Sequence, residues 1–348
     1  MRHANLSIFV PHVGCPCRCS FCNQNTISGS RELPSGELVL ALCQSAAQQL
    51  GNRVEQTEIA FFGGSFTAIQ TDYQCELLKA ARECVARFGY AGIRVSTRPD
   101  AVDEKTVERL LFYGVTALEL GAQSMDNTVL RLNARGHDVQ AVRDAAGLIR
   151  RAGISLGIQM MTGLYGSTPQ LERKTAEELI ALRPDTVRIY PTVVLQGTPL
   201  ARLQEQGKYL APGVEESAVL CAELMERFER AGISVIRVGL HASREVEQQM
   251  VGGAYHPAFR ELCEAKRYFA LALSQLQKLP RENEYELWVH PSCVSKLVGQ
   301  HRLNIEQFAR LGYRVKVKQS LKIPVGRVTI LNGGVAQDVS EIHGITGV

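Results

Sequence analysis

The sequence predicts an α/β protein: a full or partial TIM-type (β/α) barrel with a small α+β module at its carboxyl end. Short apolar runs alternate with amphipathic helical patterns over the first two-thirds of the chain, which is typical of a parallel sheet covered by helices. Glycine-rich or polar motifs directly follow these runs, and basic residues gather near the carboxyl end. We expect a barrel over 1–245, a helical connector over 246–283, a basic module over 284–331 and a loosely ordered tail over 332–348.

Seven runs have the length and composition of buried strands. They are Leu6–Val10, Glu58–Phe62, Ile93–Thr97, Thr116–Leu120, Ser155–Met160, Val187–Tyr190 and Val235–Val238. The helical patterns between them are Gly36–Leu50, Tyr73–Phe88, Glu104–Phe112, Val139–Ala152, Pro169–Leu182 and Glu215–Ala231. In a barrel of this kind the chemistry lies at the carboxyl ends of the strands, so the functional motifs should directly follow them.

Composition limits the class of protein. With 348 residues, of which 45% are hydrophobic and 21% charged, the chain can form one large and one small domain. No apolar run reaches about 18 residues, so we expect no membrane-spanning helix. The polar amino terminus lacks the apolar core of an export signal, which favours a cytoplasmic protein. A chain of this size needs no disulfide staples, and of its ten cysteines we expect five to be ordinary core or surface thiols: Cys43, Cys75, Cys84, Cys221 and Cys263.

The net charge of +4 is unevenly distributed. From Leu287 to Arg327, eight Lys and Arg residues accompany a single acid, Glu306, so this stretch carries +7 and the remainder −3. A basic module on a mildly acidic body indicates a polyanionic partner such as RNA. A solvated basic face without a partner is the alternative.

The first strand is followed by a cysteine-rich loop. Cys15, Cys19 and Cys22 form a C-x3-C-x2-C pattern. Three thiolates on one short loop suit a [4Fe–4S] cluster with one open iron, because soft sulfur ligands favour iron–sulfur clusters. Cys17 falls outside the pattern, and its role is open. A small zinc knuckle that uses it as a fourth ligand is the alternative.

This spacing resembles that of the radical S-adenosylmethionine (SAM) superfamily. The resemblance implies that SAM binds the open iron and is reductively cleaved to a 5′-deoxyadenosyl radical. It also implies an electron donor similar to flavodoxin or ferredoxin and a reducing compartment.

Further motifs follow the later strands. After the second strand come Gly63, Gly64 and Ser65, where radical SAM enzymes have a Gly-Gly-Glu-type motif for the SAM amino group. Because Ser65 replaces the acid, we expect backbone carbonyls to make this contact. Arg135 could hold the SAM carboxylate through a bidentate fork. The residues expected to bind the ribose or to edge the adenine are Gln123, Ser124, Gln159 and Tyr190.

Six segments together resemble the radical SAM half of the catalytic subunit of the Elongator complex. They are FFGGSFTAI, STRPD, LELGAQS, RGHDVQAV, MTGLYGST and VRIYPTVVLQGTPL, within Ser7–His241. More distantly the pattern is similar to oxygen-independent coproporphyrinogen oxidase, with Gln159 in place of an aspartate. Ser96 stands where Elongator-like proteins carry Glu. The resemblance implies modification of a tRNA uridine, but we expect no acetyltransferase domain in this chain, so the use of acetyl-CoA stays open.

The carboxyl-terminal module has the order strand, helix, Gly-x-x turn, helix, strand between Glu286 and Lys318, which resembles the core of a KH domain. In KH domains a G-x-x-G turn clamps the nucleic-acid backbone, but here Arg302 replaces the second glycine. A helix pair packed on the barrel is the alternative. The candidate RNA-binding residues are Lys296, Gly299, Arg302, Arg314, Lys316 and Lys318.

Three functions fit these patterns. The first is a radical SAM enzyme that modifies an RNA base, and the second is a radical SAM enzyme for a small molecule such as a porphyrin precursor. The third is a non-catalytic RNA-binding protein with a structural metal. No residue identifies the substrate carbon, so the sequence assigns no catalytic residue.

Overall fold

The computed structural model describes residues 4–10, 19–23, 33–281, 283–332 and 335–336. The chain divides into two compact units. The first comprises Met1–Ser217 and Leu224–Pro257, and the second comprises Ala218–Glu223 and Ala258–Val348.

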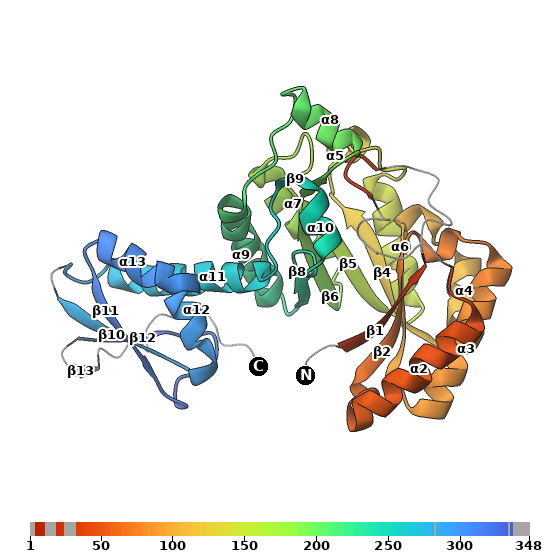
Figure 1. Ribbon diagram of the computed structural model, residues 1–348, viewed down its shortest axis with the longest axis horizontal. Coiled ribbons are helices and arrows are strands. Elements are labelled where there is room, and N and C mark those ends of the chain that lie inside the picture. Colours follow the sequence, from red (N-terminus) through yellow and green to blue (C-terminus); the bar gives the residue numbers. More distant parts are fainter. Residues whose placement is uncertain (1–3, 11–18, 24–32, 282, 333–334, 337–348) are drawn as a thin grey trace. The chain divides into compact units, whose positions relative to one another are not determined.

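A seven-stranded parallel sheet forms the centre of the first unit (Figure 1). Its strands are β1 (Ala4–Val10), β2 (Thr57–Gly63), β3 (Gly92–Thr97), β4 (Val115–Gln123), β5 (Ser155–Thr162), β6 (Thr186–Pro191) and β8 (Ser234–Val238). They pair in this order, and every neighbouring pair is parallel. The seven predicted strands are therefore confirmed. Among the described strands β1 and β8 each have one neighbour, so the sheet is an open, partial barrel.

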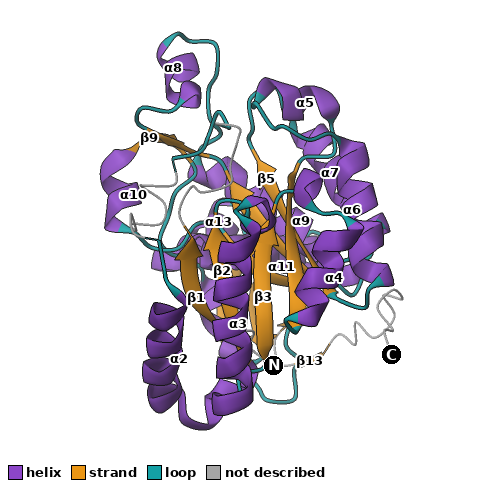
Figure 2. Cartoon of the chain, turned by 90° about the vertical axis from the view of Figure 1, so that its right-hand side faces the viewer, coloured by secondary structure: helices purple, strands orange, loops and turns teal. Residues whose placement is uncertain are grey.

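Several helices that connect these strands begin where the sequence supplies caps. The helices before the second unit's α11 are α2 (Gly36–Leu50), α3 (Thr71–Phe88), α4 (Glu104–Phe112), α5 (Asn127–Leu132), α6 (Val139–Arg151), α7 (Pro169–Ala181), α8 (Pro199–Glu205), α9 (Val214–Arg230) and α10 (Arg244–Gln249). Ser35, Asp103 and Asp138 accept a hydrogen bond from the first turn of α2, α4 and α6. Helices α2, α3, α4 and α6 lie along one face of the sheet (Figure 2). No helix in the described ranges has the length and apolarity needed to cross a membrane.

One small sheet has no counterpart among the predicted strands. Strand β7 (Val193–Leu195) pairs antiparallel with β9 (Met250–Gly253), so the pairing joins segments that are distant in the sequence. Gly252 and Gly253 give β9 little of the composition of a strand. The apolar residues Val193 and Leu195 pack with Val246 and Tyr255 in a small buried cluster of the first unit. Only tertiary packing identifies this sheet.

The second unit contains the predicted module. Helix α11 (Phe259–Leu276) is followed by β10 (Glu284–Val289), α12 (Val294–Val298), α13 (Leu303–Arg310), β11 (Arg314–Gln319), β12 (Thr329–Asn332) and β13 (Val335–Ala336). The sheet order is β11-β10-β12-β13, with β10 parallel to β11 and antiparallel to β12. The predicted succession of strand, helix, turn, helix and strand is therefore present.

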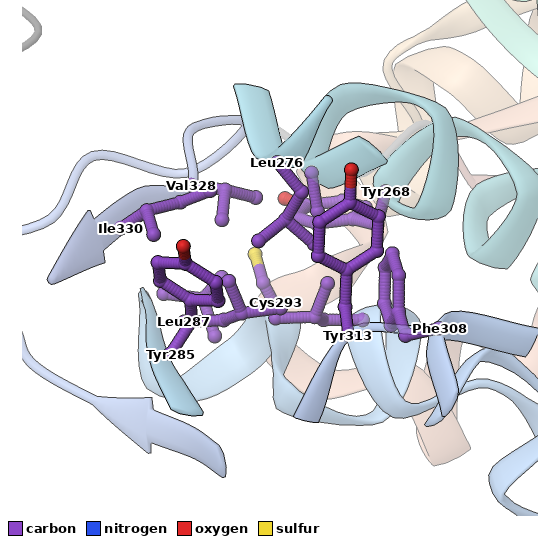
Figure 3. Close-up of a cluster of buried hydrophobic side chains, with 12 residues drawn as sticks. Tyr268, Leu276, Tyr285, Leu287, Cys293, Phe308, Tyr313, Val328 and Ile330 are labelled. Carbon is purple, nitrogen blue, oxygen red and sulfur yellow. The ribbon is translucent and has the colours of Figure 1, made fainter. Parts of the chain in front are cut away.

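Alternation along β10 gives the second unit its core. Tyr285, Leu287 and Val289 are buried, whereas Glu284, Glu286 and Trp288 occupy the other face of the sheet. The buried side chains pack against α11, α12 and α13 (Figure 3). This core includes Tyr268, Leu276, Cys293, Phe308, Tyr313, Val328 and Ile330. Because α11 supplies part of it, this helix belongs to the module.

The two units divide the chain differently from the predicted domains. The expected connector over 246–283 is divided, because β9 belongs to the first unit and α11 to the second. Of the expected tail over 332–348, Asn332 ends β12 and Val335–Ala336 pairs with that strand as β13, while 333–334 and 337–348 lie outside the described residues. Apolar burial of α11 and backbone pairing of β13 are tertiary effects that composition does not contain.

Candidate functional site

A cavity of about 310 Å³ opens at the carboxyl ends of the parallel strands. All seven strands of the sheet contribute to its wall, as expected for an α/β barrel. The lining residues at or just beyond the strand ends include Phe9, Gly63, Gly64, Thr97, Gln123, Gln159, Tyr190 and Arg237. Cys19 and Cys22 also line the cavity, whereas Cys15 and Cys17 lie outside the described residues.

A chain of buried charges crosses the sheet beside the cavity. Glu119 of β4 is 1% exposed and accepts hydrogen bonds from Arg94 Nη1 at 3.2 Å and from Arg188 Nη2 at 2.9 Å. Arg94 also donates to Glu58 at 2.7 Å, and Gln159 donates to Glu119 at 2.8 Å. These contacts connect β2, β3, β4, β5 and β6. We call these five residues (Glu58, Arg94, Glu119, Gln159 and Arg188) the ionic belt.

The belt keeps Glu119 ionised. Burial alone would raise the pKa of Glu119, but the guanidiniums of Arg188 and Arg94 hold it below its ordinary value. Gly157 provides the space for this side chain, since a Cβ there would lie 2.7 Å from Glu119 Cγ. The Arg188 guanidinium also lies 5.0 Å from the centre of the Phe62 ring, a cation–π arrangement. Arg188 and Gln159 are thereby presented to the cavity in defined orientations.

Asn133 holds the part of the cysteine loop that the structure describes, residues 19–23. Its side chain is fully buried and accepts a hydrogen bond from Ser20 Oγ at 2.8 Å, while its carbonyl accepts from Ser20 N at 3.1 Å. The Asn133 amide donates to the carbonyls of Val129 and Tyr165, both at 2.8 Å. The loop is therefore bound to the residues that follow β4 and β5.

Arg135 lies two residues after Asn133 and contacts Cys19 of the loop. Its Nη1 donates to Cys19 Sγ at 3.2 Å, and its Nη2 donates to the Gly121 carbonyl at 2.7 Å. Its Nε is buried without a hydrogen-bond partner among the described residues. This arginine can therefore stabilise a thiolate at Cys19 and still offer a donor to an anionic ligand.

Two backbone irregularities shape the wall. Gly63 has φ 126°, and a Cβ there would lie 2.3 Å from the Val10 carbonyl oxygen, so only glycine fits beside β1. The pairing of β4 with β5 shifts register between Gly121 and Gln123, and Gln123 has φ 65°. Such a bulge redirects a side chain. Gln123 lines the cavity, and its buried Oε1 has no partner in the described part of the chain.

Six of the eight predicted SAM-binding residues line the same cavity. Gly63, Gly64, Gln123, Arg135, Gln159 and Tyr190 line the cavity. Ser65 and Ser124 do not: the Ser65 hydroxyl lies 2.7 Å from Thr97 Oγ1 and accepts from Arg98 N, and the Ser124 hydroxyl accepts from Asp126 N. Both serines are buried and hold turns behind the wall.

The predicted RNA-binding residues lie in the second unit and differ in their contacts. Lys296 lies 3.6 Å from Glu264, Lys316 lies 3.0 Å from Glu284, and Lys318 lies 3.8 Å from Glu286. Neither Arg302 nor Arg314 has an ion-pair partner among the described residues.

The Gly-x-x turn of this unit has an unusual backbone. Gly299 has φ 76°, and Arg302 adopts φ 64° and ψ 20°, the left-handed region that favours glycine. Glycine adopts this conformation easily, and a G-x-x-G turn has a glycine at this position. Here Arg302 adopts it instead.

Several residues of the site are absent from the set that the sequence predicts. Glu119 and Arg188 interrupt apolar strand runs with a charge, which is the signal that could have revealed them, because an isolated buried charge is costly. Asn133 stands two residues before Arg135, but nothing in its local pattern indicates its contact with Ser20. That contact joins residues 113 positions apart.

Sequence comparison identifies the family of the chain. A family model described as the radical SAM superfamily matches residues 9–179, and one described as a radical SAM C-terminal domain matches residues 184–270. The chain belongs to the radical SAM superfamily. It is an enzyme of that superfamily, whose cofactors are a [4Fe–4S] cluster and SAM.

Curated relatives share the radical SAM part. A tRNA uridine(34) acetyltransferase of Methanocaldococcus infernus is 29% identical over 192 residues, which is 49% of this chain and 36% of that protein. One of Dehalococcoides mccartyi is 26% identical over 59% of this chain and 52% of its own length. Elongator complex protein 3 of Homo sapiens is 29% identical over 63% of this chain and 43% of its own length. The chain thus spans about a third to a half of these relatives.

A solved structure supports the fold. An N-terminally truncated archaeal Elp3 of Methanocaldococcus infernus superposes with a TM-score of 0.60 at 20% identity, covering 82% of this chain and 66% of that one. At this identity the likeness concerns the fold alone.

The residues of the cavity fit these cofactors. Cys19 and Cys22 present two sulfurs to the cavity, and the third cysteine of the motif, Cys15, lies outside the described residues. The unsatisfied Arg135 Nε requires an acceptor, which a carboxylate supplies, and the unsatisfied Gln123 Oε1 requires a donor, which a hydroxyl or ammonium group supplies. SAM carries all three groups.

We predict that Asn133→Ala lowers retention of the cluster. The substitution removes three side-chain hydrogen bonds and leaves buried partners unsatisfied, which costs about 1–3 kcal/mol for each such group. Ser20→Ala removes only one of these bonds and should have a smaller effect. Iron per chain, measured after anaerobic reconstitution and desalting, should fall in the order wild type, Ser20→Ala, Asn133→Ala. Equal iron in all three proteins would contradict the assignment of Asn133 as the anchor of the loop.

The buried His137 predicts a pH dependence of stability. Burial, and then the neighbouring Arg135 cation, lower the pKa of His137 to about 4. The unfolded chain binds a proton near the ordinary value of about 6.5, whereas the folded chain does not, so stability falls as pH decreases from 6.5 towards 4. The loss should approach about 3 kcal/mol. In urea unfolding between pH 7 and pH 5, His137→Asn should show a flatter pH profile than the wild type, and parallel profiles would contradict this role.

Proposed function

We propose that this enzyme modifies a base of an RNA, with tRNA as the foremost candidate. The observation that carries the proposal is the similarity of the chain, over 49% to 63% of its length, to tRNA uridine(34) acetyltransferases and Elongator complex protein 3. The basic second unit supports it, since eight Lys and Arg residues accompany one acid between Leu287 and Arg327. A polyanion is the natural partner of such a surface.

When bound, the cluster and SAM would supply the radical chemistry, which is reductive cleavage of SAM to a 5′-deoxyadenosyl radical able to abstract hydrogen from the substrate. The protein residues would bind and orient the reactants. Gly63 and Gly64 would offer backbone groups to the SAM amino group, Arg135 its unsatisfied Nε to the carboxylate, and Gln123 and Gln159 hydrogen bonds to the ribose. Tyr190 would edge the adenine.

The cavity wall also limits side reactions of the radical. Phe9, Phe21 and Phe62 line the cavity together with Met161 and Leu240. Such apolar groups exclude water from the reacting centre. An electron donor similar to flavodoxin or ferredoxin would supply the electron, and a reducing compartment such as the cytoplasm suits the three-cysteine cluster.

The proposal predicts that RNA stimulates SAM cleavage. The anaerobically reconstituted chain is reduced with dithionite, and 5′-deoxyadenosine is measured with SAM in the presence and absence of total tRNA. We expect several-fold more product with tRNA, and none from a Cys19→Ser, Cys22→Ser double variant. Cys75→Ser, which changes a half-buried thiol of α3, is the matched control and should retain the stimulation.

Formation of 5′-deoxyadenosine at the same rate with and without tRNA would contradict an RNA substrate. In that case a small-molecule radical SAM enzyme, the coproporphyrinogen-oxidase-like alternative, becomes the better function. A protein that binds RNA but never cleaves SAM would instead be the non-catalytic alternative.

A second prediction concerns the basic unit. Since Arg302 and Arg314 have no ion-pair partner among the described residues, whereas Lys316 pairs with Glu284 at 3.0 Å, the arginines should contribute more to RNA binding. Each phosphate contact that a variant removes should reduce the slope of log K against log salt by about 0.7 to 0.9. We expect this for Arg302→Gln and for Arg314→Gln, and a smaller change for Lys316→Gln. Arg87→Gln, on α3, is the control, and unchanged slopes for both arginine variants would contradict the prediction.

A further inference from the structure

Two arginines stand side by side at one edge of the barrel. Arg188 of β6 and Arg237 of β8 are register partners on neighbouring strands, and both line the cavity. Two like charges on neighbouring strands repel one another, and an anion bound at Arg237 would lower this repulsion.

Only one of these two arginines, Arg188, has its charge balanced by an acidic side chain among the described residues. Arg188 donates to Glu119 through both Nε and Nη2, at 3.0 and 2.9 Å. Arg237 has no ion-pair partner among the described residues. Glu119 is already shared between Arg188 and Arg94, so its charge is balanced within the ionic belt.

The remaining charged residues that line the cavity supply no negative charge to Arg237. Arg98 is paired with Asp100 through two hydrogen bonds, at 3.0 and 2.5 Å. Arg135 donates to Cys19 and to the Gly121 carbonyl. Of the residues described, no Asp or Glu lines the cavity. Among the described lining arginines, Arg237 therefore has no acidic partner, and unlike Arg135 it is not already assigned to the SAM carboxylate.

Arg237 is not among the residues proposed to hold the polar groups of SAM. Those residues belong to or follow β2, β4 and β5, whereas Arg237 lies on β8, at the end of the described strand order. We therefore assign an anion at Arg237 to the substrate, bound beside SAM.

One polar group lies beside this position. His241 follows β8 and lines the cavity, and burial together with the Arg237 cation lowers the pKa of His241. A neutral imidazole beside a guanidinium can donate a hydrogen bond to an oxyanion.

We infer that Arg237, assisted by His241, forms an oxyanion subsite for the substrate. Resting on the proposed function, the inference names the bound group: the phosphate of the nucleotide whose base is modified. Arginine suits phosphate because its planar fork matches two phosphate oxygens. The subsite would then position the nucleotide with its base towards the SAM side of the cavity.

Binding of small nucleotides tests the inference directly. Equilibrium dialysis measures the affinity of uridine 5′-monophosphate and of uridine for the reconstituted chain, with SAM and without reductant. Wild type should bind the monophosphate about ten- to a hundredfold more tightly than uridine, the gain of one or two charge-assisted hydrogen bonds. Arg237→Gln should abolish this preference, Arg237→Lys should retain part of it, and Arg87→Gln should leave it unchanged.

Thermal stability separates a binding arginine from a structural one. Without ligand, Arg237→Gln should melt about one to three degrees higher than wild type, because the like-charged pair is removed. An arginine retained for structure would instead lower the melting temperature when substituted. A lower melting temperature combined with an unchanged nucleotide preference would overturn the subsite.

A carboxylate arm separates this inference from the proposed function. If succinate binds in an Arg237-dependent manner and the monophosphate shows no preference over uridine, the oxyanion subsite is supported and the nucleotide assignment fails with the RNA proposal. If neither anion binding depends on Arg237, the subsite itself is wrong, whatever the outcome of the tRNA assay.

Discussion

The buried carboxylate of Glu119 is the constraint on which the site depends. An ion buried in a protein costs several kcal/mol unless it is paired and hydrogen-bonded, and Glu119 is 1% exposed. It is satisfied by Arg94, Arg188 and Gln159, which come from three other strands. The sheet must therefore hold its register across β3 to β6 for these contacts to form, and that register sets the positions of the cavity wall.

A second set of buried hydrogen bonds links the cysteine loop to the barrel. The short segment from Asn133 to His137 anchors Ser20, contacts the Cys19 sulfur through Arg135 and places a buried imidazole against the Ala122 carbonyl. A hydrogen bond to a ligating sulfur is among the features that tune an iron–sulfur cluster. One segment after β4 thus connects the described part of the cysteine loop with the wall of the cavity.

Charge is distributed differently in the two units. In the first unit, the arginines that line the cavity are mostly neutralised by acids or engaged by neighbouring groups, and Arg237 is the exception that suggests a substrate anion. In the second unit, lysines on β11 pair with glutamates of β10, which reduces the effective charge of that strand. Arg302 and Arg314, by contrast, have no ion-pair partner among the described residues. A count of Lys and Arg residues alone overstates the positive charge of this unit's surface, because a lysine paired with a glutamate contributes little net charge.

The sequence by itself determined the architecture of the first unit and the class of chemistry. Strand and helix periodicity is local, and a C-x3-C-x2-C loop is a contiguous pattern, so both are visible without coordinates. The wall residues Gly63, Gln123, Arg135 and Gln159 are predictable because functional groups follow barrel strands. Tertiary structure alone decided that Ser65 and Ser124 lie behind the wall, that Asn133 holds Ser20, and that Arg188 is neutralised while its neighbour Arg237 is not. These are contacts between residues far apart in the chain, and their energies depend on burial and distance, which no local pattern encodes.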